Sequence, residues 1–416
     1  MKAKLAQSQY GVSIGGPLVK DKLFFFANFE KDEREDLGTE GWIPDNNDGV
    51  VAVNEASVLE SDLIAVSNAL KNLGYDSGAY SGFNYDSGST KGIFKLDWNI
   101  NEKHRLALIY NFLRASREAP AHPTSLGLRG PSANILQFEN SGYEINNHID
   151  SFLMEVNSTF NQSTTNKLQI GYTYFDDFRN PLSSPAPSIL IKDGNGSNYI
   201  VAGHEPFSIH NKLNQKVFQL TKNMNFFKGD HTITVGFAFE KFMFDNSFNL
   251  GLYGGTFGFD VNGTPSNFDD DRHFTSVTEF LTFAQPGGLI DNLINGAETS
   301  FNRNNNMEVG AVRGWSLAET NVGQLAFYLQ DEWEVNNAFK LTYGVRFDKP
   351  LFFNTKEKIQ ENIDRKGTYQ PNNIYTDPST NQSTTLNSLD LPSNNWLISS
   401  RLGFNWNVND ESKLQM

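Results

Sequence analysis

The chain contains no cysteine, and none of its stretches approaches the roughly 18 consecutive apolar residues of a membrane helix. The absence of cysteine excludes a disulfide scaffold and thiolate metal sites. The absence of a long apolar run excludes a helical membrane protein, because the longest apolar cluster, residues 23 to 27, has only the length of a strand. Residues 1 to 10 carry two lysines but no apolar core of a signal peptide, so we expect an exported protein to need a start outside this sequence.

Basic residues are also scarce: 34 Lys and Arg stand against 48 Asp and Glu, which gives a net charge of -14. A negative field repels phosphate backbones, so nucleic acid is excluded as a partner. Aromatic residues, in contrast, are abundant at 13%, including 34 Phe, although the mean hydropathy is -0.46. Many aromatic residues in a hydrophilic chain are typical of strands in which every second residue is polar.

The clearest such pattern is a long hairpin over residues 321 to 350, in which both arms alternate with period two. We predict that one face of its second arm contacts lipid, through Phe339, Leu341, Tyr343, Val345 and Phe347. The first arm repeats the alternation, except that Asp331 stands in the apolar register. Between the arms lies Asn336-Asn337, a pair that tolerates the positive φ of a tight hairpin turn.

The same pattern recurs along the chain as strand pairs with short connections. The other predicted strands are residues 9–16 and 22–29, 92–100 and 106–114, 149–160 and 167–175, 216–226 and 232–244, and 396–408, with a twelfth strand beginning near Met416. After Glu240 the apolar phase shifts to Phe242 and Phe244, which indicates a bulge or the end of the half-buried zone.

Long polar segments separate the pairs, at about residues 33–90, 115–147, 177–211, 249–320 and 352–393. Loops of this length are uncommon in compact soluble domains, but strict alternation of short and long connections is typical of an outer-membrane barrel. Two loops carry capping-box patterns that predict helices, one at Ser57 and one at Ser276. An apolar stripe at Leu63, Val66 and Leu70 follows the first, and Gly74 is placed to end that helix.

No catalytic, cofactor or metal site is predicted from the residues. His204-Glu205 with His210 has no standard metal spacing and reads as a solvated polar loop, and Asp269–Asp271 lacks the rest of a calcium loop. The Gly-rich residues 251 to 258 lack the Lys-Ser/Thr of a phosphate-binding loop, and the chain has no nucleophile elbow. The acidic run over residues 30 to 36 reads as a solvated barrel rim, with cation-bridged lipopolysaccharide contact as an alternative. The candidates for ligand contact are aromatic residues of the longest loop, namely Phe257, Phe259, Phe268, Phe274 and Trp315.

Three stretches resemble TonB-dependent outer-membrane receptors of the Oar-like type. Residues 9 to 26, QYGVSIGGPLVKDKLFFF, resemble the first barrel strands after the plug of these receptors. The segments FYLQDEW (327–333) and LTYGVRFD (341–348) resemble a mid-barrel hairpin, and SRLGFNW (400–406) is a third match. The three matches occur in the order of the family and span almost the whole chain.

The resemblance implies an all-β, antiparallel transmembrane barrel of which residues 1–416 supply about 11 to 12 of roughly 22 strands. It also implies a Gram-negative outer membrane, energised uptake of a large ligand, and coupling to the TonB system through a plug. The sequence departs from the family pattern because no plug and no aromatic C-terminal assembly signal is present. We therefore expect a partial barrel that is not an enzyme and needs no cofactor, with outer-membrane lipid and lipopolysaccharide as partners and an unknown ligand. A passive porin or adhesin, and a soluble β-rich carbohydrate binder, remain as alternatives.

Overall fold

A computed structural model describes residues 6–121, 130–184, 186–205, 207–208, 211–248, 274–295, 317–366, 372–409 and 412–415. Its dominant element is a 12-stranded antiparallel sheet with the strand order β1-β2-β5-β6-β8-β9-β12-β13-β14-β15-β18-β19. The strands are β1 (Ala6–Val19), β2 (Leu23–Leu37), β5 (Asn84–Asn101), β6 (His104–Ala119), β8 (Tyr143–Asn161), β9 (Thr164–Pro181), β12 (Lys212–Lys228), β13 (His231–Ser247), β14 (Ala318–Asn336), β15 (Phe339–Leu351), β18 (Leu397–Asn409) and β19 (Ser412–Gln415). The predicted all-β antiparallel barrel architecture is confirmed.

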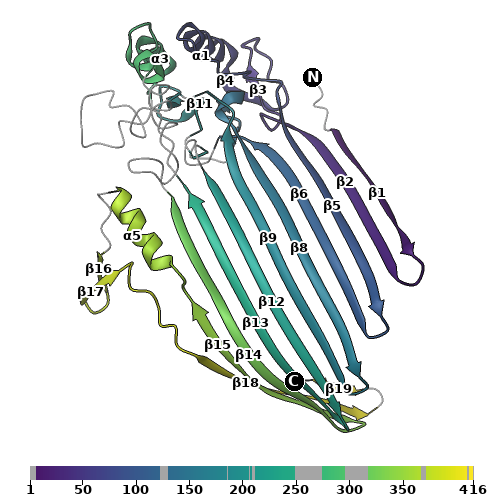
Figure 1. The fold of residues 1–416 in the computed structure, drawn as a ribbon. Coiled ribbons are helices and arrows are strands. Elements are labelled where there is room, and N and C mark those ends of the chain that lie inside the picture. The colour runs from purple at the N-terminus through teal and green to yellow at the C-terminus, as the bar shows by residue number, and fades with distance from the viewer. Residues whose placement is uncertain are drawn as a thin grey trace.

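Each strand of the large sheet pairs with the strand of that sheet that precedes it and the one that follows it along the chain (Figure 1). The strands with other numbers belong to the long connections. Short turns join the strands at one end of the sheet, and the long connections lie at the other. The edges of the described sheet are β1 and β19, which do not pair with each other. None of the helices in the described segments combines the length and the apolar composition that a membrane crossing requires.

Asparagine side chains close three of the short turns in the same way. The Oδ1 atom of Asn101 accepts hydrogen bonds from the backbone N–H groups of residues 103 and 104, and Asn161 accepts one from residue 163. In the hairpin of β14 and β15, Asn336 Oδ1 accepts from the N–H groups of residues 338 and 339, both at 2.9 Å. Neither Asn336 nor Asn337 has a positive φ, so the predicted backbone conformation is wrong. The turn instead uses asparagine as a side-chain acceptor for its own backbone.

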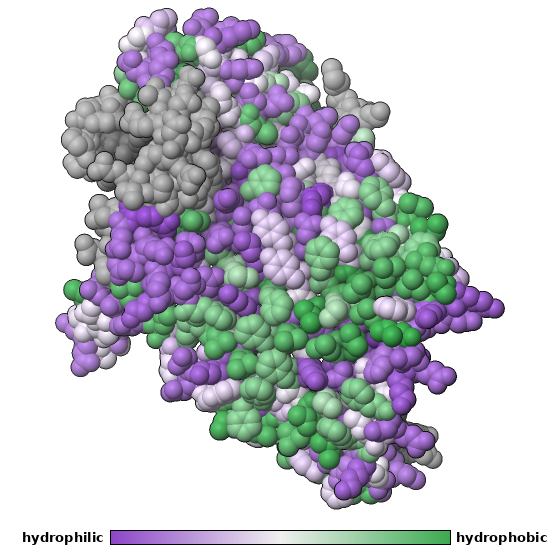
Figure 2. Space-filling model, viewed as in Figure 1, coloured by the Kyte–Doolittle hydropathy of each residue, from purple (hydrophilic) through white to green (hydrophobic). Residues whose placement is uncertain are grey.

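The strand register places the apolar sets of all the hairpins on one face of the sheet. For example, Phe347 is paired with Phe327, which is paired with Phe237, and residues paired across antiparallel strands share a face. On the face seen in Figure 2, hydrophobic side chains gather over the middle of the strands, and hydrophilic ones predominate above them. The five residues predicted to face lipid lie on this apolar face of β15; Tyr343 is 41% exposed and Phe347 38%.

Asp331 lies on the same face, where one of its two carboxylate oxygens is bound by side chains of both neighbouring strands. Its Oδ2 atom accepts from the Tyr343 hydroxyl at 2.7 Å and lies 2.7 Å from His231 Nδ1, and only 9% of the residue is exposed. The His231 ring stacks on Trp333 at 5.3 Å between centroids. The cluster therefore joins three neighbouring strands, β13, β14 and β15, through Oδ2 of one carboxylate, whereas its Oδ1 atom is buried without a hydrogen-bond partner among the described residues.

The opposite, polar face carries ion pairs and amide contacts along its length. Glu155 on β8 binds Lys167 on β9 at 3.0 Å, and Lys340 on β15 binds Glu332 on β14 at 2.7 Å. Farther along, Phe242 and Phe244 stay in unbroken register with β12 and β14, so they lie on this polar face near the loop end. The sequence-based suggestion of a bulge after Glu240 is therefore wrong, and its alternative, the end of the half-buried zone, fits.

Tyr328 crosses the polar face through a gap that a glycine leaves open. Its ring lies over Gly236, its hydroxyl donates to Asn223 Oδ1 on β12, and the Arg346 guanidinium is 5.3 Å from its centroid. A Cβ at Gly236 would stand 1.8 Å from the ring, which no real contact allows. The glycine thus lets one aromatic side chain connect β12, β14 and β15.

We expect Gly236→Ala to lower the stability of the barrel by about 1 to 3 kcal/mol, because the Tyr328 ring must leave its site and give up the bond to Asn223. The shift is measured as the temperature at which the heat-modifiable folded band is lost in detergent. Gly171→Ala on β9 is the matched control, since a Cβ there meets only atoms at 3.6 to 3.9 Å. Equal shifts for the two variants would contradict this assignment.

Above the strand ends, four of the long connections fold together into one unit, which we call the loop domain (Figure 1). Its elements are β3 (Ile43–Asp45), β4 (Glu55–Leu59), α1 (Glu60–Asn72), β7 (Leu136–Gln137), the 3-10 turn Glu139–Ser141, β10 (Ser188–Lys192), β11 (Asn198–Gly203) and α3 (Val277–Phe283). A three-stranded sheet in the order β10-β11-β7 joins two connections, and Phe274 bridges to Ile191 from a third.

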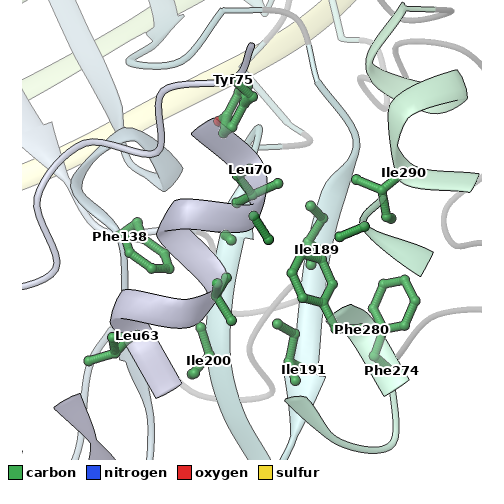
Figure 3. Packing of buried hydrophobic residues seen from close by; sticks show 14 of the residues in the cluster. Leu63, Leu70, Tyr75, Phe138, Ile189, Ile191, Ile200, Phe274, Phe280 and Ile290 are labelled. Atoms are coloured by element: carbon green, nitrogen blue, oxygen red, sulfur yellow. The ribbon is translucent and has the colours of Figure 1, made fainter. Parts of the chain in front are cut away.

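The loop domain has its own hydrophobic core, drawn in Figure 3. Helix α1 contributes Leu63, Val66 and Leu70, each 0% exposed, which confirms the predicted apolar stripe. These side chains pack with residues of the other connections, among them Phe138, Ile189, Ile191, Ile200, Phe274, Phe280 and Ile290. Because each connection supplies only part of this core, none of them can bury its apolar residues alone.

The two predicted helices exist, but their starts differ. Ser276 caps α3 by accepting from the Glu279 N–H at 3.1 Å, as the capping box predicts. Helix α1 begins at Glu60 with no side-chain cap, and Ser57 lies in β4, so the predicted cap at Ser57 is wrong. At the other end, Gly74 has φ +80° and donates to the Lys71 carbonyl, as expected of a residue that ends a helix.

The fifth connection docks separately. Helix α5 (Thr355–Lys366) packs against β14, where the Thr355 hydroxyl donates to the Asn321 carbonyl at 2.6 Å and Lys358 lies 3.3 Å from Glu319. It is followed by a small hairpin of β16 (Asn372–Thr376) and β17 (Ser383–Asn387).

Candidate functional site

The surface of the loop domain carries a polar groove of about 650 Å³. Its walls come from the four connections: the start of α1, residue 134, the β10–β11 hairpin and the start of α3. The side chains that define it are Ser57, Asp62, Asn134, Lys192, Asp193, Asn195, Asn198, Tyr199, Ser276 and Thr278. A groove shared by four connections exists only while the loop domain is folded.

The tip of the β10–β11 hairpin is held in place by its own carboxylate. Asp193 Oδ1 accepts from the N–H groups of Asn195 at 2.8 Å and Ser197 at 3.0 Å, and these bonds lower the pKa of Asp193 below its usual value. Gly194 and Gly196 supply positive φ angles of 86° and 97°. The Gly194 N–H donates to the Thr275 carbonyl at 3.0 Å, so the tip is also tied to the start of α3.

Tyr199 fixes the opposite wall. Its hydroxyl donates to Asp62 Oδ2 at 3.0 Å and accepts from the Leu59 N–H at 2.8 Å, which ties β11 to the start of α1. Burial raises the pKa of Tyr199 to about 12, so the phenol stays protonated and keeps its hydrogen bond to Asp62 at neutral pH. On the same side, the Ser57 N–H donates to the Ala133 carbonyl at 2.7 Å and joins the first two connections.

The groove presents groups that suit the binding of a polar molecule. It presents hydroxyls, amides, the carboxylates of Asp62 and Asp193, and the ammonium group of Lys192. A serine with a histidine within hydrogen-bond reach, as nucleophilic catalysis requires, is missing from the described lining, and so is a cluster of three metal-ligating side chains anywhere in the described residues. Such a surface offers many hydrogen bonds and charges of both signs to a polar molecule.

Of the aromatic residues predicted to contact ligand, the structure describes only Phe274, which does not line this groove. Phe274 is 0% exposed, and its ring packs edge-on against Phe280 at 5.2 Å in the core of the loop domain, so no face of it is open to a ligand. The other candidates, Phe257, Phe259, Phe268 and Trp315, lie outside the described residues, as do His210, Asp269–Asp271 and residues 251 to 258. The residues of β15 that are predicted to face lipid are far from the groove in the sequence and lie on a strand of the large sheet, not in the loop domain.

Sequence reasoning missed the groove residues because it treated residues 177–211 as one polar loop. The signal was present: the tight turn sequence Asp193-Gly-Asn-Gly stands between two apolar runs, Ile189–Ile191 and Tyr199–Val201. This pattern is typical of a β-hairpin, and the structure has one there, β10 and β11.

A buried polar cluster lies at the base of the loop domain. His204 and Glu205 are each 1% exposed, so the prediction that they are solvated is wrong. His204 Nδ1 lies 2.9 Å from Ser183 Oγ, and Glu205 Oε2 accepts from the Phe207 N–H at 3.0 Å and from the Ser208 hydroxyl. Burial lowers the pKa of His204 to about 3 and raises the pKa of Glu205 above its usual value.

The Ser183–His204 contact resembles the pair used in nucleophilic catalysis, but its surroundings exclude that use. A histidine held neutral by burial is a weak base, and neither side chain lines the groove of the loop domain. The cluster therefore belongs to the packing of the loop domain.

The geometry of hairpins, two-faced sheet and surface loops is the geometry of a known family. The model of the family described as outer membrane beta barrel domain matches residues 1–48 and 50–415. The chain belongs to this family. It therefore lies in the outer membrane of a Gram-negative type of bacterium, and a soluble β-rich binder is ruled out. None of the curated proteins matches the sequence.

Solved structures show the same fold at low sequence identity. The chain is similar to the outer membrane transporter YddB from Escherichia coli, with a TM-score of 0.50 and 11% identity, over 97% of this chain and 36% of that chain. It is also similar to the pyoverdine-bound FpvA of P. aeruginosa (TM-score 0.48, 11% identity, 98% of this chain, 40% of that chain) and to the siderophore receptor PirA from Acinetobacter baumannii (TM-score 0.43, 12% identity, 99% and 40%). The chain thus spans well under half the length of these proteins. The predicted resemblance to outer-membrane receptors and transporters is confirmed.

Proposed function

We propose that the chain is the ligand-capturing part of a TonB-dependent outer-membrane receptor, in which the loop domain binds a polar molecule outside the cell and the barrel admits it with energy supplied through TonB. The single observation that carries the proposal is that four separate connections fold into one domain with a polar groove. Loops that served only to join strands would not need a shared core of this extent.

The sheet supports the transport part of the proposal. Its polar face carries ion pairs and amides that suit a hydrated interior, and its apolar face suits lipid. Unpaired strand edges in a bilayer cost several kcal/mol per backbone group, so the edges of β1 and β19 require further strands. The chain covers 36% of the length of the transporter YddB, which fits a barrel that further strands complete. We propose that such a barrel is coupled to TonB through a plug.

The groove indicates the class of ligand. Two carboxylates and one ammonium group give its charged lining a net charge of about -1, and the remaining groups are hydroxyls and amides. A strongly anionic ligand would be repelled, and an apolar one would leave these groups without partners. We therefore infer a neutral or weakly cationic molecule that is rich in hydroxyl or amide groups.

The experiment uses the full-length protein that contains this chain, purified from cells in mild detergent and examined by native mass spectrometry. The wild type is expected to carry a small polar molecule, which the double variant Lys192→Ala/Thr278→Ala loses by at least tenfold. Asn68→Ala is the control, because Asn68 is exposed on α1 and does not line the groove. Equal retention in all three proteins would place ligand binding elsewhere.

A further inference from the structure

A lysine stands in the middle of the apolar face of the large sheet. Lys222 lies on β12, where the register pairs it with Leu168 of β9 and Phe237 of β13. Residues paired across antiparallel strands share a face, and the same row continues to Val156 on one side and to Phe327 on the other. Lys222 itself is exposed. A cation therefore interrupts a row of apolar side chains that extends from β8 to β14.

The position along β12 places Lys222 near the middle of the membrane. On this face the apolar part of the strand begins at Phe226, near the short turn, and the first charged side chain on the loop side is Lys216. Lys222 is four residues from Phe226 and six residues from Lys216. About 9 to 11 residues of a tilted strand cross the apolar core of a bilayer, so these two residues mark its borders and Lys222 lies well inside them.

The lysines of the opposite face are neutralised, whereas Lys222 is not. On the polar face Lys91, Lys95, Lys167 and Lys340 each bind a carboxylate at 2.7 to 3.1 Å. Lys222 forms no ion pair with any of the described residues. The lysine on the apolar face therefore lacks the counter-charge that the chain provides on the polar face.

Two acids of the apolar face border this zone, and both are already bound. Asp331 lies two strands away on β14, four residues nearer the turns than the row of Lys222, and side chains of β13 and β15 hold its Oδ2 atom. Asp150 lies two strands away on β8, six residues nearer the loops, and Arg114 binds it at 2.7 Å. A second copy of the described residues would offer the same two acids, so it would not supply a free carboxylate at the level of Lys222.

The polar neighbour of Lys222 on this face is an amide. Asn166 of β9 lies opposite Met224, one step of two residues nearer the turns. Its Oδ1 atom is buried and has no hydrogen-bond partner among the described residues. An amide oxygen can accept a hydrogen bond from an ammonium group, but it leaves the positive charge in place. Neighbouring strands thus carry two polar groups with unused hydrogen-bonding capacity inside a mainly apolar surface.

The depth of Lys222 decides which kind of partner can provide the counter-charge. Lipid headgroups lie about 12 to 15 Å from the middle of the bilayer, farther than an extended lysine side chain reaches. Charged side chains inside a membrane are rare, and they pair with another group or line a water-filled cavity. Lys222 points away from the polar face, so pairing is the case that applies. Only a molecule that itself crosses the membrane can place a carboxylate at this depth.

We propose that β9, β12 and β13 form, around Lys222, a contact surface for a different membrane protein whose membrane-crossing segment carries an Asp or Glu that binds the Lys222 ammonium group. The flanking side chains Leu168, Leu220, Met224 and Phe237 provide apolar contact around the ion pair and keep water from it. An ion pair without water is sensitive to the loss of either partner, because the remaining charge is left buried and unpaired. The surface is separate from the ligand groove and does not depend on what the receptor transports.

The test uses the full-length protein in outer membranes isolated from the cells that produce it. Dicyclohexylcarbodiimide enters the apolar phase and joins an amine and a carboxylate that are in contact into an amide, without a spacer. Peptide mass spectrometry is expected to find residue 222 joined to an Asp or Glu in a membrane-crossing segment of another protein. A crosslink to an acid of the receptor's own sequence, in the same copy or a second one, would overturn the proposal.

Three variants separate the ion pair from general packing. Lys222→Met is expected to weaken the purified complex at least 100-fold, measured by its dissociation on dilution in detergent, because the acid of the partner is left unpaired. Lys222→Arg keeps the charge and should retain the complex within tenfold, although a guanidinium group does not react with the carbodiimide. Lys216→Met is the matched control on the same strand and face, and it should leave the complex unchanged.

Nanodiscs of phospholipid alone give the opposite expectation, because the partner is absent from them. There Lys222→Met should raise the folding equilibrium of the barrel about 30- to 1000-fold, as the removal of a lysine from the bilayer midplane predicts, and Lys216→Met should change it less than tenfold. Equal stability of Lys222→Met and the wild type would show that the ammonium group reaches water and would overturn the proposal. The absence of a crosslink at residue 222, or a complex that Lys222→Met retains, would also overturn it. The heat-modifiable band of each variant verifies that its barrel has assembled.

Discussion

Leu63→Asp is expected to unfold the loop domain while the strands remain assembled. Leu63 is 0% exposed among apolar side chains of four connections, and a carboxylate there would have no partner. Burying an unpaired charge in an apolar core costs at least about 4 kcal/mol, which is comparable to the stability of a unit of this size. Because the core is shared, the loss should spread from α1 to β10, β11 and α3.

The measurement is amide hydrogen exchange of the full-length protein in detergent, followed by peptide mass spectrometry. Peptides covering residues 57–75 and 186–203 should lose protection together, whereas peptides from β12 to β15 should keep it. Ile64→Asp is the control, because the neighbouring side chain is 43% exposed on the same helix. Protection retained in Leu63→Asp, or lost equally in Ile64→Asp, would show that the connections do not fold as one unit. In the first case the groove would not depend on this core.

The fold could be predicted from the sequence because its strands obey a local rule. Alternation with period two requires no knowledge of distant residues, so the hairpins and their apolar face follow from the chain in order. The exceptions arise where a residue is selected for its contact with a neighbouring strand. Asp331 stands in the apolar register because its partners, His231 and Tyr343, come from the strands on either side. Gly236 has no visible role in its own strand and leaves room for Tyr328 of the next.

The candidate site could not be predicted in the same way, since its residues meet only in three dimensions. Aromatic residues in a polar loop suggested ligand contact, but Phe274 uses its ring to complete a core supplied mainly by other connections. His204 and Glu205 looked solvated because their neighbours in sequence are polar, although packing against other loops buries them. Asp62 and Tyr199 are 137 positions apart, and no local pattern indicates that they share a hydrogen bond.

Acidification is expected to open the loop domain through His204. The folded-state pKa of His204 is about 3, whereas an unfolded histidine titrates near 6.5, so the unfolded state takes up a proton first as the pH falls. The contribution of the neutral, buried imidazole to stability is thus fully present above pH 6.5 and is lost as the pH falls from 6.5 towards 3. At pH 4.5 the two pKa values correspond to a loss of about 2 to 3 kcal/mol relative to neutral pH.

Glu205 acts in the opposite direction, because burial raises its folded-state pKa and proton uptake then favours the folded state. The stabilisation by Glu205 therefore develops as the pH falls towards 4.5, the ordinary pKa of a glutamate carboxyl. Below this pH only the loss of stability caused by His204 continues to grow. Hydrogen exchange in the peptide covering residues 186–203 should therefore accelerate most steeply between pH 4.5 and 3.5, after correction for the intrinsic rate. His204→Asn, which keeps an acceptor or donor near Ser183 Oγ and cannot gain a charge, should be less stable at neutral pH but should lose this steep dependence. If the variant keeps the wild-type pH profile, the carboxylates of the loop domain control its acid opening, and the buried histidine has no part in it.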